Sequence, residues 1–203
     1  MTAAMVETVP PQGKSELRRR MMELRDALDG AARADLADLV AEQLVELEAF
    51  RKARGIGIYY STGSEVHTVQ LIQRLVEEEG CDAFLPFIMN GELQMTEWRP
   101  SDPVVVAPYV GFQPRFSKAV PLERIEVMIV PGLAFDERGH RLGSGEGLYD
   151  RLLALMGPEV TRIGIGYQTQ LVESVPLEDG DEALDAVVTD QVVIACPRRS
   201  SED

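Results

Sequence analysis

The spacing of apolar residues predicts a pair of helices near the start of the chain. A stripe whose members lie three or four positions apart predicts a helix over 14–28. These apolar positions are Leu17, Met21, Leu24 and Leu28. A second stripe predicts a helix over about 32–53, and Asp29-Gly30 separates the two helices.

The apolar pattern changes after residue 54 to buried strands that alternate with helices. Runs rich in β-branched residues predict strands at 55–60, 81–86, 125–130, 162–167, 184–188 and 191–195. Stripes of helical period predict further helices at 65–79 and 148–156. Asn90-Gly91 lies between two strand-forming runs and predicts a tight hairpin, whereas the proline-rich segment 99–118 is expected to be a loop.

This alternation predicts a single α/β domain in which helices flank a mostly parallel sheet. The run 125–130 is apolar throughout, which is typical of a central strand that is buried on both faces. No repeat, low-complexity tract or internal linker divides the 203 residues. We expect the domain to span 13–197, between a flexible N-terminal tail (1–12) and a C-terminal tail (198–203).

Composition and charge exclude several classes of protein. The formal net charge is −14, and an acidic body repels phosphate backbones, so we expect no nucleic-acid partner. No apolar run approaches the ~18 residues of a membrane span, and the first residues lack a signal-peptide pattern. Two cysteines and two histidines without ligand spacing argue against zinc. We therefore expect a cytoplasmic monomer with reduced Cys81 and Cys196 and no membrane partner.

The glycine-rich loop over about 131–147 carries the most informative chemistry. It follows the central strand and leads into the predicted helix 148–156. Gly143, Gly145 and Gly147 alternate with other residues, which lets backbone N–H groups approach an anion. The spacing matches neither a P-loop nor a dinucleotide-binding fingerprint. Taken alone, the pattern fits a phosphate cradle or an ordinary surface loop.

Three basic residues of the first predicted helix add to this picture. Lys14, Arg18 and Arg25 fall within about 40° of one another around the helix axis, beside the apolar stripe rather than opposite it. Side chains in this position point toward the edge of a cleft. The alternative interpretation is that they are solvated charges on the helix surface.

Several short motifs in a fixed order resemble the 5-formyltetrahydrofolate cyclo-ligase (5,10-methenyltetrahydrofolate synthetase) family. Three of them lie in or beside the glycine-rich loop: Pro-Gly-Leu-Ala-Phe-Asp at 131–136, Arg-Leu-Gly at 141–143 and Tyr-Asp-Arg at 149–151. The others are Lys14-x-x-x-Arg18, Glu65-Val-His-Thr68 and Asp185-Ala-Val-Val-Thr189. The resemblance covers most of the chain, from Lys14 to about Asp190.

The resemblance implies a NagB/RpiA/CoA-transferase-like α/β fold and an ATP-dependent ring closure. In this reaction 5-formyltetrahydrofolate becomes 5,10-methenyltetrahydrofolate, while ADP and phosphate are released. The γ-phosphoryl group activates the formyl oxygen, and N10 of the folate then attacks the formyl carbon. The implied substrates are therefore ATP and 5-formyltetrahydrofolate, and the implied cofactor is Mg²⁺.

The resemblance also implies roles for individual residues. The implied catalytic residues are Arg141 and Tyr149. The implied ATP-binding residues are Lys14, Arg18, Arg141, Leu142, Gly143, Ser144, Gly145, Glu146, Gly147 and Tyr149. The implied folate contacts are Tyr60 and Glu65. The implied Mg²⁺ ligands are Asp150 and Asp185.

Two other hypotheses remain open at this point. A non-catalytic nucleotide- or folate-binding module of the same fold is favoured by Gln113 and Glu146, which together with Leu148 depart from the residues that the family usually has. An enzyme of related fold that acts on a sugar phosphate without ATP is disfavoured by the basic pair at 14 and 18 and by Asp150. The polyglutamate preference of the substrate is not encoded in any motif.

Overall fold

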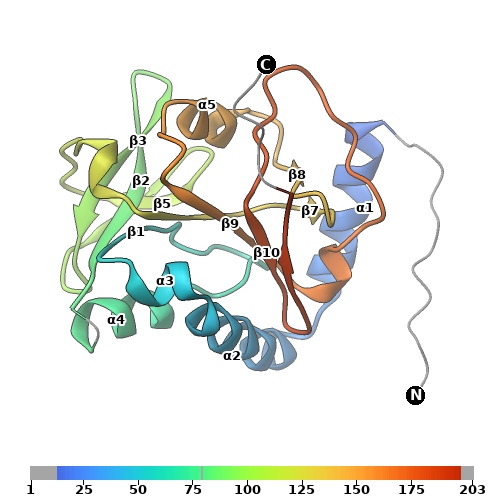
Figure 1. Cartoon of the computed structure of the whole chain (residues 1–203), viewed down its shortest axis with the longest axis horizontal. Coiled ribbons are helices and arrows are strands. Elements are labelled where there is room, and N and C mark those ends of the chain that lie inside the picture. Colours follow the sequence, from blue (N-terminus) through green and yellow to red (C-terminus); the bar gives the residue numbers. More distant parts are fainter. Residues whose placement is uncertain (1–12, 79, 198–203) are drawn as a thin grey trace.

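Helices cover both faces of one central sheet (Figure 1). The structure, a computed structural model, describes residues 13–78 and 80–197, so the expected tails (1–12 and 198–203) lie outside the described residues. The sheet has seven strands in the order β11-β10-β9-β6-β1-β2-β3. None of the helices in the described ranges combines the length and the apolar character needed to cross a bilayer.

The strands of this sheet follow the predicted order. They are β1 (Gly55–Gly57), β2 (Asp82–Met89), β3 (Glu92–Trp98), β6 (Val127–Val130), β9 (Thr161–Ile165), β10 (Ala186–Val188) and β11 (Val193–Ala195). The pairs between β10, β9, β6, β1 and β2 are parallel, whereas the edge strands β3 and β11 are antiparallel to their neighbours. The mostly parallel sheet is thus confirmed, with the apolar strand β6 at its centre.

Two apolar layers join the helices to the sheet. The main helices are α1 (Lys14–Asp26), α2 (Gly30–Glu46), α3 (Glu48–Lys52), α4 (Val69–Glu77) and α5 (Leu148–Ala154). Apolar residues of α2, α3 and α4 pack on one face of the sheet, and those of α5 pack on the other. Leu17 and Met21 of α1 form a smaller cluster with Ala134 and Leu142, which places α1 beside the glycine-rich loop.

The largest differences between the predicted and the observed helix boundaries occur at two places. The predicted helix 32–53 is divided into α2 and α3, because Leu47 has an extended backbone with ψ of 121°. The predicted helix 65–79 begins only at Val69 as α4. Residues 61–68 instead form a loop in which Ser61 and Thr68 exchange two hydrogen bonds between backbone N–H groups and side-chain hydroxyls.

The proline-rich segment 99–118 is not the simple loop that its composition predicts. It contains β4 (Val104–Ala107) and β5 (Gly111–Pro114), which pair as an antiparallel hairpin. The glycine-rich loop likewise contains a short pair, β7 (Ala134–Phe135) and β8 (Arg141–Leu142). The Asn90-Gly91 hairpin is confirmed, since both residues have positive φ and Met89 pairs with Glu92.

Candidate active site

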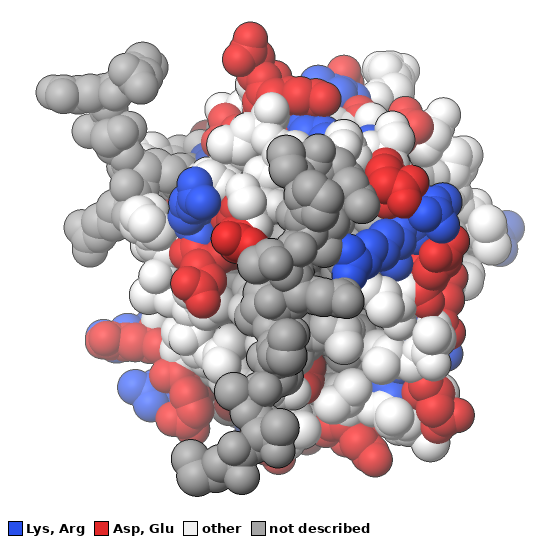
Figure 2. All heavy atoms as spheres, turned by 90° about the vertical axis from the view of Figure 1, so that its right-hand side faces the viewer, with Lys and Arg blue, Asp and Glu red and all other residues white. Residues whose placement is uncertain are grey.

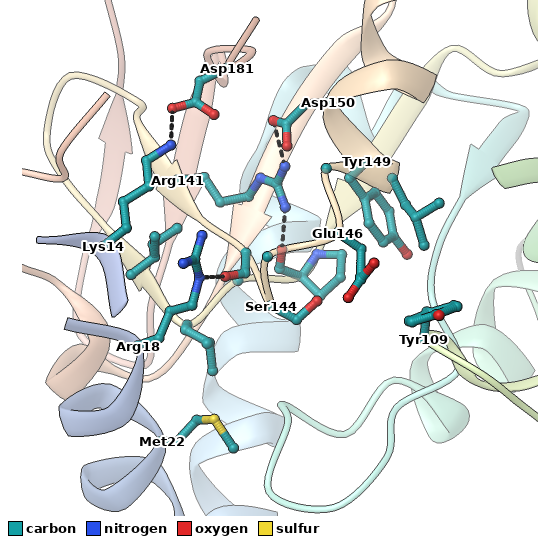
Figure 3. Close-up of a pocket in the computed structure, with 18 of the residues that line it drawn as sticks. Lys14, Arg18, Met22, Tyr109, Arg141, Ser144, Glu146, Tyr149, Asp150 and Asp181 are labelled. Carbon is teal, nitrogen blue, oxygen red and sulfur yellow. Dashed lines mark hydrogen bonds and ion pairs between the residues drawn. The ribbon is translucent and has the colours of Figure 1, made fainter. Parts of the chain in front are cut away.

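A pocket of about 250 Å³ opens between α1 and the segment that links β8 to α5 (Figure 3). It lies at the carboxyl end of the central strand β6, because Pro131 and Gly132 directly follow that strand and line the pocket. Ligands of parallel α/β sheets bind at this edge. The polar residues around the pocket include Lys14, Arg18, Arg25, Glu65, Arg141, Ser144, Glu146, Tyr149, Asp150, Glu178 and Asp181.

Lys14 and Arg18 of α1 both reach this pocket, one helical turn apart. The guanidinium of Arg18 donates through Nε to the carbonyl oxygen of Gly143 at 2.9 Å. The ammonium of Lys14 lies 2.6 Å from Asp181 Oδ2 and 3.0 Å from Glu178 Oε2. The basic side of α1 therefore faces the glycine-rich loop, and each of these two cations already has a partner there.

The ion pair of Lys14 with Asp181 changes the proton affinity of both groups. Burial disfavours charge on Asp181, but the hydrogen bonds from Lys14 and from the backbone N–H of Glu178 outweigh it, so the pKa of Asp181 lies below its ordinary value. Burial likewise acts against charge on Lys14, yet its two carboxylate partners raise the pKa of Lys14 above its ordinary value. Both side chains are therefore charged at neutral pH.

The glycine-rich loop bends tightly around the pocket between β8 and α5. Gly145 and Gly147 have φ of 118° and 62°, in the region that residues with a side chain rarely adopt. A Cβ atom at Gly145 would also lie 3.5 Å from the guanidinium carbon of Arg18. A side chain at this position would thus be strained by its backbone angle, and its Cβ atom would lie in ordinary contact with the cation that faces the loop.

Arg141 is the most deeply buried cation of the pocket, with only 3% of its side chain exposed. Its Nη2 donates to Asp150 Oδ1 at 2.7 Å, and its Nη1 donates to the carbonyl oxygen of Pro131 at 3.2 Å. Its guanidinium carbon lies 5.7 Å from the centre of the Tyr149 ring. Asp150 also accepts a hydrogen bond from the backbone N–H of Glu182 at 3.3 Å, so α5 and the segment 178–182 meet at this carboxylate.

Burial shifts the pKa values of two further groups that line the pocket. It raises the pKa of Tyr149 well above the ordinary value, so the phenol keeps its proton at neutral pH. It also raises the pKa of Glu65, although the backbone N–H of Thr62 donates to Glu65 Oε2 at 2.8 Å and opposes the shift. Perturbed acids and phenols of this kind in a cleft are typical of functional sites.

Two of the residues implied as site residues do not line the pocket. Asp185 Oδ2 accepts a hydrogen bond from the backbone N–H of Arg162 at 2.8 Å, so this carboxylate ties β9 to the strand that follows it. Asp185 is absent from the lining of the pocket, whereas Asp150 and Asp181 both line it. Tyr60 packs against Trp98 and Phe112, with ring centres 6.0 and 5.5 Å away. Its role as a folate contact stays a prediction.

Asp181 is the main pocket residue that the sequence analysis missed. It lies in an acidic segment, and its spacing from neighbouring acids gives no reason to prefer it. Only the path of the chain after β9 brings this side chain back to Lys14 of α1. No periodic or motif signal encodes such a return.

The three departures from the family pattern have different structural settings. Glu146 is exposed and lies on the side of the pocket near Tyr109, whereas Lys14 and Arg18 lie on the opposite side (Figure 3). Leu148 is buried in the apolar layer under α5. Gln113 accepts a hydrogen bond from the backbone N–H of Ile88 at 3.1 Å and so joins β5 to β2. Only Glu146 adds a negative charge to the pocket.

The face of the molecule that carries α1 has mixed charge. Lys and Arg side chains visible there lie next to Asp and Glu side chains rather than forming one continuous basic surface (Figure 2). This matches the pairs that Lys14 makes in the pocket. The visible surface thus carries no continuous basic patch.

Comparisons with known proteins agree on one family. The family model described as "5-formyltetrahydrofolate cyclo-ligase family" matches residues 10–190. A 5-formyltetrahydrofolate cyclo-ligase of Escherichia coli K12 is 31% identical over 171 residues, which cover 81% of this chain and 93% of the relative. One from Mycolicibacterium smegmatis is 30% identical and covers 88% of this chain and 94% of the relative. The solved structure of an Aquifex aeolicus 5,10-methenyltetrahydrofolate synthetase superposes with a TM-score of 0.81 at 28% identity, covering 95% of this chain and 97% of the other.

Proposed function

The chain belongs to the 5-formyltetrahydrofolate cyclo-ligase family, and from this premise we propose that it converts 5-formyltetrahydrofolate to 5,10-methenyltetrahydrofolate with ATP. The protein is an enzyme of the ligase class that acts on a folate. The observation that carries the assignment to a site is the convergence of Lys14, Arg18, Arg141 and the glycine-rich loop on one pocket.

The proposed chemistry requires activation of a poor electrophile, a formamide. The formyl oxygen takes the γ-phosphoryl group of ATP and ADP departs. N10 of the folate then attacks the formyl carbon and loses its proton to solvent, the C–O bond to phosphate breaks, and the products are the methenyl ring and inorganic phosphate. Little covalent work remains for the protein, so its task is to position the two substrates and to stabilise negative charge on the phosphoryl group.

We propose that Arg141 and Tyr149 act on the phosphoryl group and the formyl oxygen. Arg141 is buried and paired with Asp150, so its guanidinium contributes a strong electrostatic interaction in a partly water-excluded site. Tyr149 lies beside it and retains its phenolic proton, so it donates a hydrogen bond without competing as an anion. Both groups are held by the start of α5 and by β8.

We assign nucleotide binding to the glycine-rich loop and to the basic side of α1. Arg18 and the tight bends at Gly145 and Gly147 support contact with phosphate oxygens. The remaining loop residues of this proposal are Leu142, Gly143, Ser144 and Glu146. Lys14 joins them once its contacts with Asp181 and Glu178 are exchanged for contacts with phosphate.

The proposed Mg²⁺ ligands are Asp150 and Asp181, and Asp181 replaces the sequence-based choice of Asp185. Both are carboxylates in the same pocket as the cations that would bind phosphate, and hard oxygen donors of this kind suit Mg²⁺. Two carboxylates alone would leave the remaining coordination positions of Mg²⁺ to phosphate oxygens and water, as is usual for this ion. When bound, Mg²⁺ neutralises charge on the transferred phosphoryl group.

We propose that Glu65 binds the pterin ring of the folate. Its carboxylate lies on the wall of the pocket, and a carboxylate oxygen accepts hydrogen bonds from the amino and ring N–H donors of a pterin. Partial burial raises the pKa of this carboxyl, and a partner that supplies hydrogen-bond donors favours its charged form. Tyr60 does not line this pocket, and its contact with the folate stays a prediction.

One assay separates the proposed enzyme from a binding module. Protein, Mg²⁺, ATP and 5-formyltetrahydrofolate are mixed, and methenyl absorbance and ADP release are followed together. We expect both signals in a ratio of one to one. Binding of ATP and folate by equilibrium dialysis without either signal would instead establish the non-catalytic module, which the exposed Glu146 favours.

We also propose that the protein acts as a cytoplasmic monomer. Cys81 and Cys196 are both buried thiols, which supports a reducing compartment. Size-exclusion chromatography with light scattering tests the monomeric state, and a dimer mass would contradict it.

A further inference from the structure

Arg162 is a buried arginine outside the pocket, yet its contacts lead to the two pocket carboxylates. It lies on β9 and its side chain is 3% exposed. Its Nη1 donates to Glu182 Oε2 at 2.6 Å. Its Nη2 donates to the carbonyl oxygens of Leu153 and Met156, at 2.7 and 3.2 Å. One guanidinium thus joins the end of α5 to the acidic segment 178–185.

Arg162 adds a cation at the carbonyl end of α5, where the carbonyl oxygen of Leu153 also accepts from the backbone N–H of Met156. The last carbonyls of a helix have no partner within the helix, and a cation there is favoured by the helix dipole. The helix α5 ends at Ala154, and Arg162 binds carbonyls on both sides of this end. Asp150, in the first turn of the same helix, is therefore fixed from the opposite end of the helix.

The contact with Glu182 fixes the acidic segment in turn. The backbone N–H of Glu182 donates to Asp150, and Asp181 is its direct neighbour in the chain. Asp185, at the other end of the segment, accepts a hydrogen bond from the backbone N–H of Arg162. Asp185, one of the two metal ligands that the family resemblance implied, is therefore part of the support beneath the pocket.

We propose that Arg162, acting through Glu182, is a positioning residue that sets the placement of Asp150 and Asp181 for the metal-bound nucleotide. The inference rests on the proposed function. Arg162 touches neither substrate nor metal in this arrangement, and it acts only through the two elements that it joins. Loss of a group that orients metal ligands typically weakens metal binding by about 10- to 100-fold.

Three variants and one control test this inference. Glu182→Ala removes the link, whereas Glu182→Gln keeps an oxygen that accepts from Arg162. The double variant with Arg162→Met and Glu182→Gln removes the buried charge together with its counter-charge, which preserves folding better than loss of one partner. The matched control is Glu173→Ala, an exposed glutamate outside the pocket and the contacts described above. Each protein is titrated calorimetrically with ATP, once with Mg²⁺ and once with EDTA.

We expect Glu182→Ala and the double variant to weaken binding of Mg-ATP by about tenfold. The affinity for metal-free ATP stays within about twofold of that of the wild type, because Lys14, Arg18 and the glycine-rich loop are unchanged. Glu182→Gln and Glu173→Ala bind Mg-ATP like the wild type. If the role were purely structural, the variants would have a lower melting temperature and would bind Mg-ATP and metal-free ATP equally more weakly. That result would overturn the inference.

The outcomes also separate this inference from the proposed function. If the wild type binds Mg-ATP and the folded double variant binds it equally well, the positioning role is wrong while the proposed function stands. If the wild type binds no Mg-ATP, the proposed function fails and this inference fails with it.

Discussion

Replacement of Asp150 by asparagine tests whether this carboxylate serves the fold, the nucleotide or both. Position alone suggests an acid at the start of a helix that contributes little to stability. In the structure Asp150 Oδ1 lies 2.7 Å from Arg141 Nη2. The side chain of Asp150 is 19% exposed, and that of Arg141 is 3% exposed. Asparagine keeps an oxygen for Arg141 and for the N–H of Glu182 but removes the charge.

The magnitude follows from the kind of hydrogen bond that is exchanged. A hydrogen bond to a charged group contributes about 1.5–3 kcal/mol to stability and a neutral one about 0.5–1.5 kcal/mol. The substitution therefore costs about 1–1.5 kcal/mol, less than the 3–5 kcal/mol for breaking a fully buried ion pair. In a chain of this size each kcal/mol corresponds to about 2–4 °C, so we expect the melting temperature to fall by about 2–6 °C.

The same substitution changes the affinities for Mg-ATP and for metal-free ATP in opposite directions. We expect Mg-ATP to bind at least about tenfold more weakly, because a metal ligand is lost. Metal-free ATP binds more tightly, because one negative charge near its phosphates is gone. Differential scanning calorimetry without ligand measures the change in melting temperature. Isothermal titration calorimetry with ATP, in the presence of Mg²⁺ or of EDTA, measures the two affinities.

The matched control for this experiment is Asp179→Asn. It makes the same charge change at an exposed residue of the acidic segment that does not line the pocket. An unchanged melting temperature in Asp150→Asn would refute the stabilising ion pair with Arg141. Unchanged binding of Mg-ATP would refute the assignment of Asp150 to the metal.

Three further substitutions test single contacts. Burial raises the pKa of Glu65, so the folded state binds its proton more tightly than the unfolded state, and stability is lost as pH rises through the window above the ordinary value. Glu65→Gln should therefore melt at a higher temperature than the wild type at pH 7.5 while folate binding is lost, and equal pH profiles of the two melting temperatures would contradict this. Glu146→Gln removes an exposed charge at the pocket and should tighten ATP binding by up to about fivefold at low salt; an affinity equal to that of the wild type would show that the carboxylate does not sense the phosphates. Gln113→Ala removes the acceptor for the N–H of Ile88 and should lower stability by about 1 kcal/mol in urea unfolding without a change in kcat or KM, and a fall in kcat would show that Gln113 serves the reaction.

The tertiary structure decided which carboxylates share the pocket. Asp181 and Asp185 lie four residues apart in the same acidic segment, and nothing local distinguishes them. One pairs with Lys14 of α1, and the other accepts from the backbone of β9. The choice depends on how a loop returns across the sheet, which is set by long-range contacts such as the pair of Arg162 with Glu182.

The pairing of the short strands β4 and β5 could not be predicted from the sequence either. The hairpin of β4 and β5 lies in a segment whose prolines and glycines resemble those of a loop, and its place is set by contacts such as that of Gln113 with β2. The break between α2 and α3 at Leu47 is also a tertiary effect, because the apolar stripe continues across it.

The sequence by itself determined the order of the main elements, the parallel core around β6, the Asn90-Gly91 hairpin and the basic face of α1. These features depend on periodicity and turn chemistry, which involve only a few neighbouring residues and can therefore be predicted from one sequence. The pairings of Arg141 with Asp150 and of Lys14 with Asp181 join residues that are 9 and 167 positions apart. The closing of the pocket by such pairs is a property of the packed molecule, because it requires two elements to be brought together before either charge has a partner.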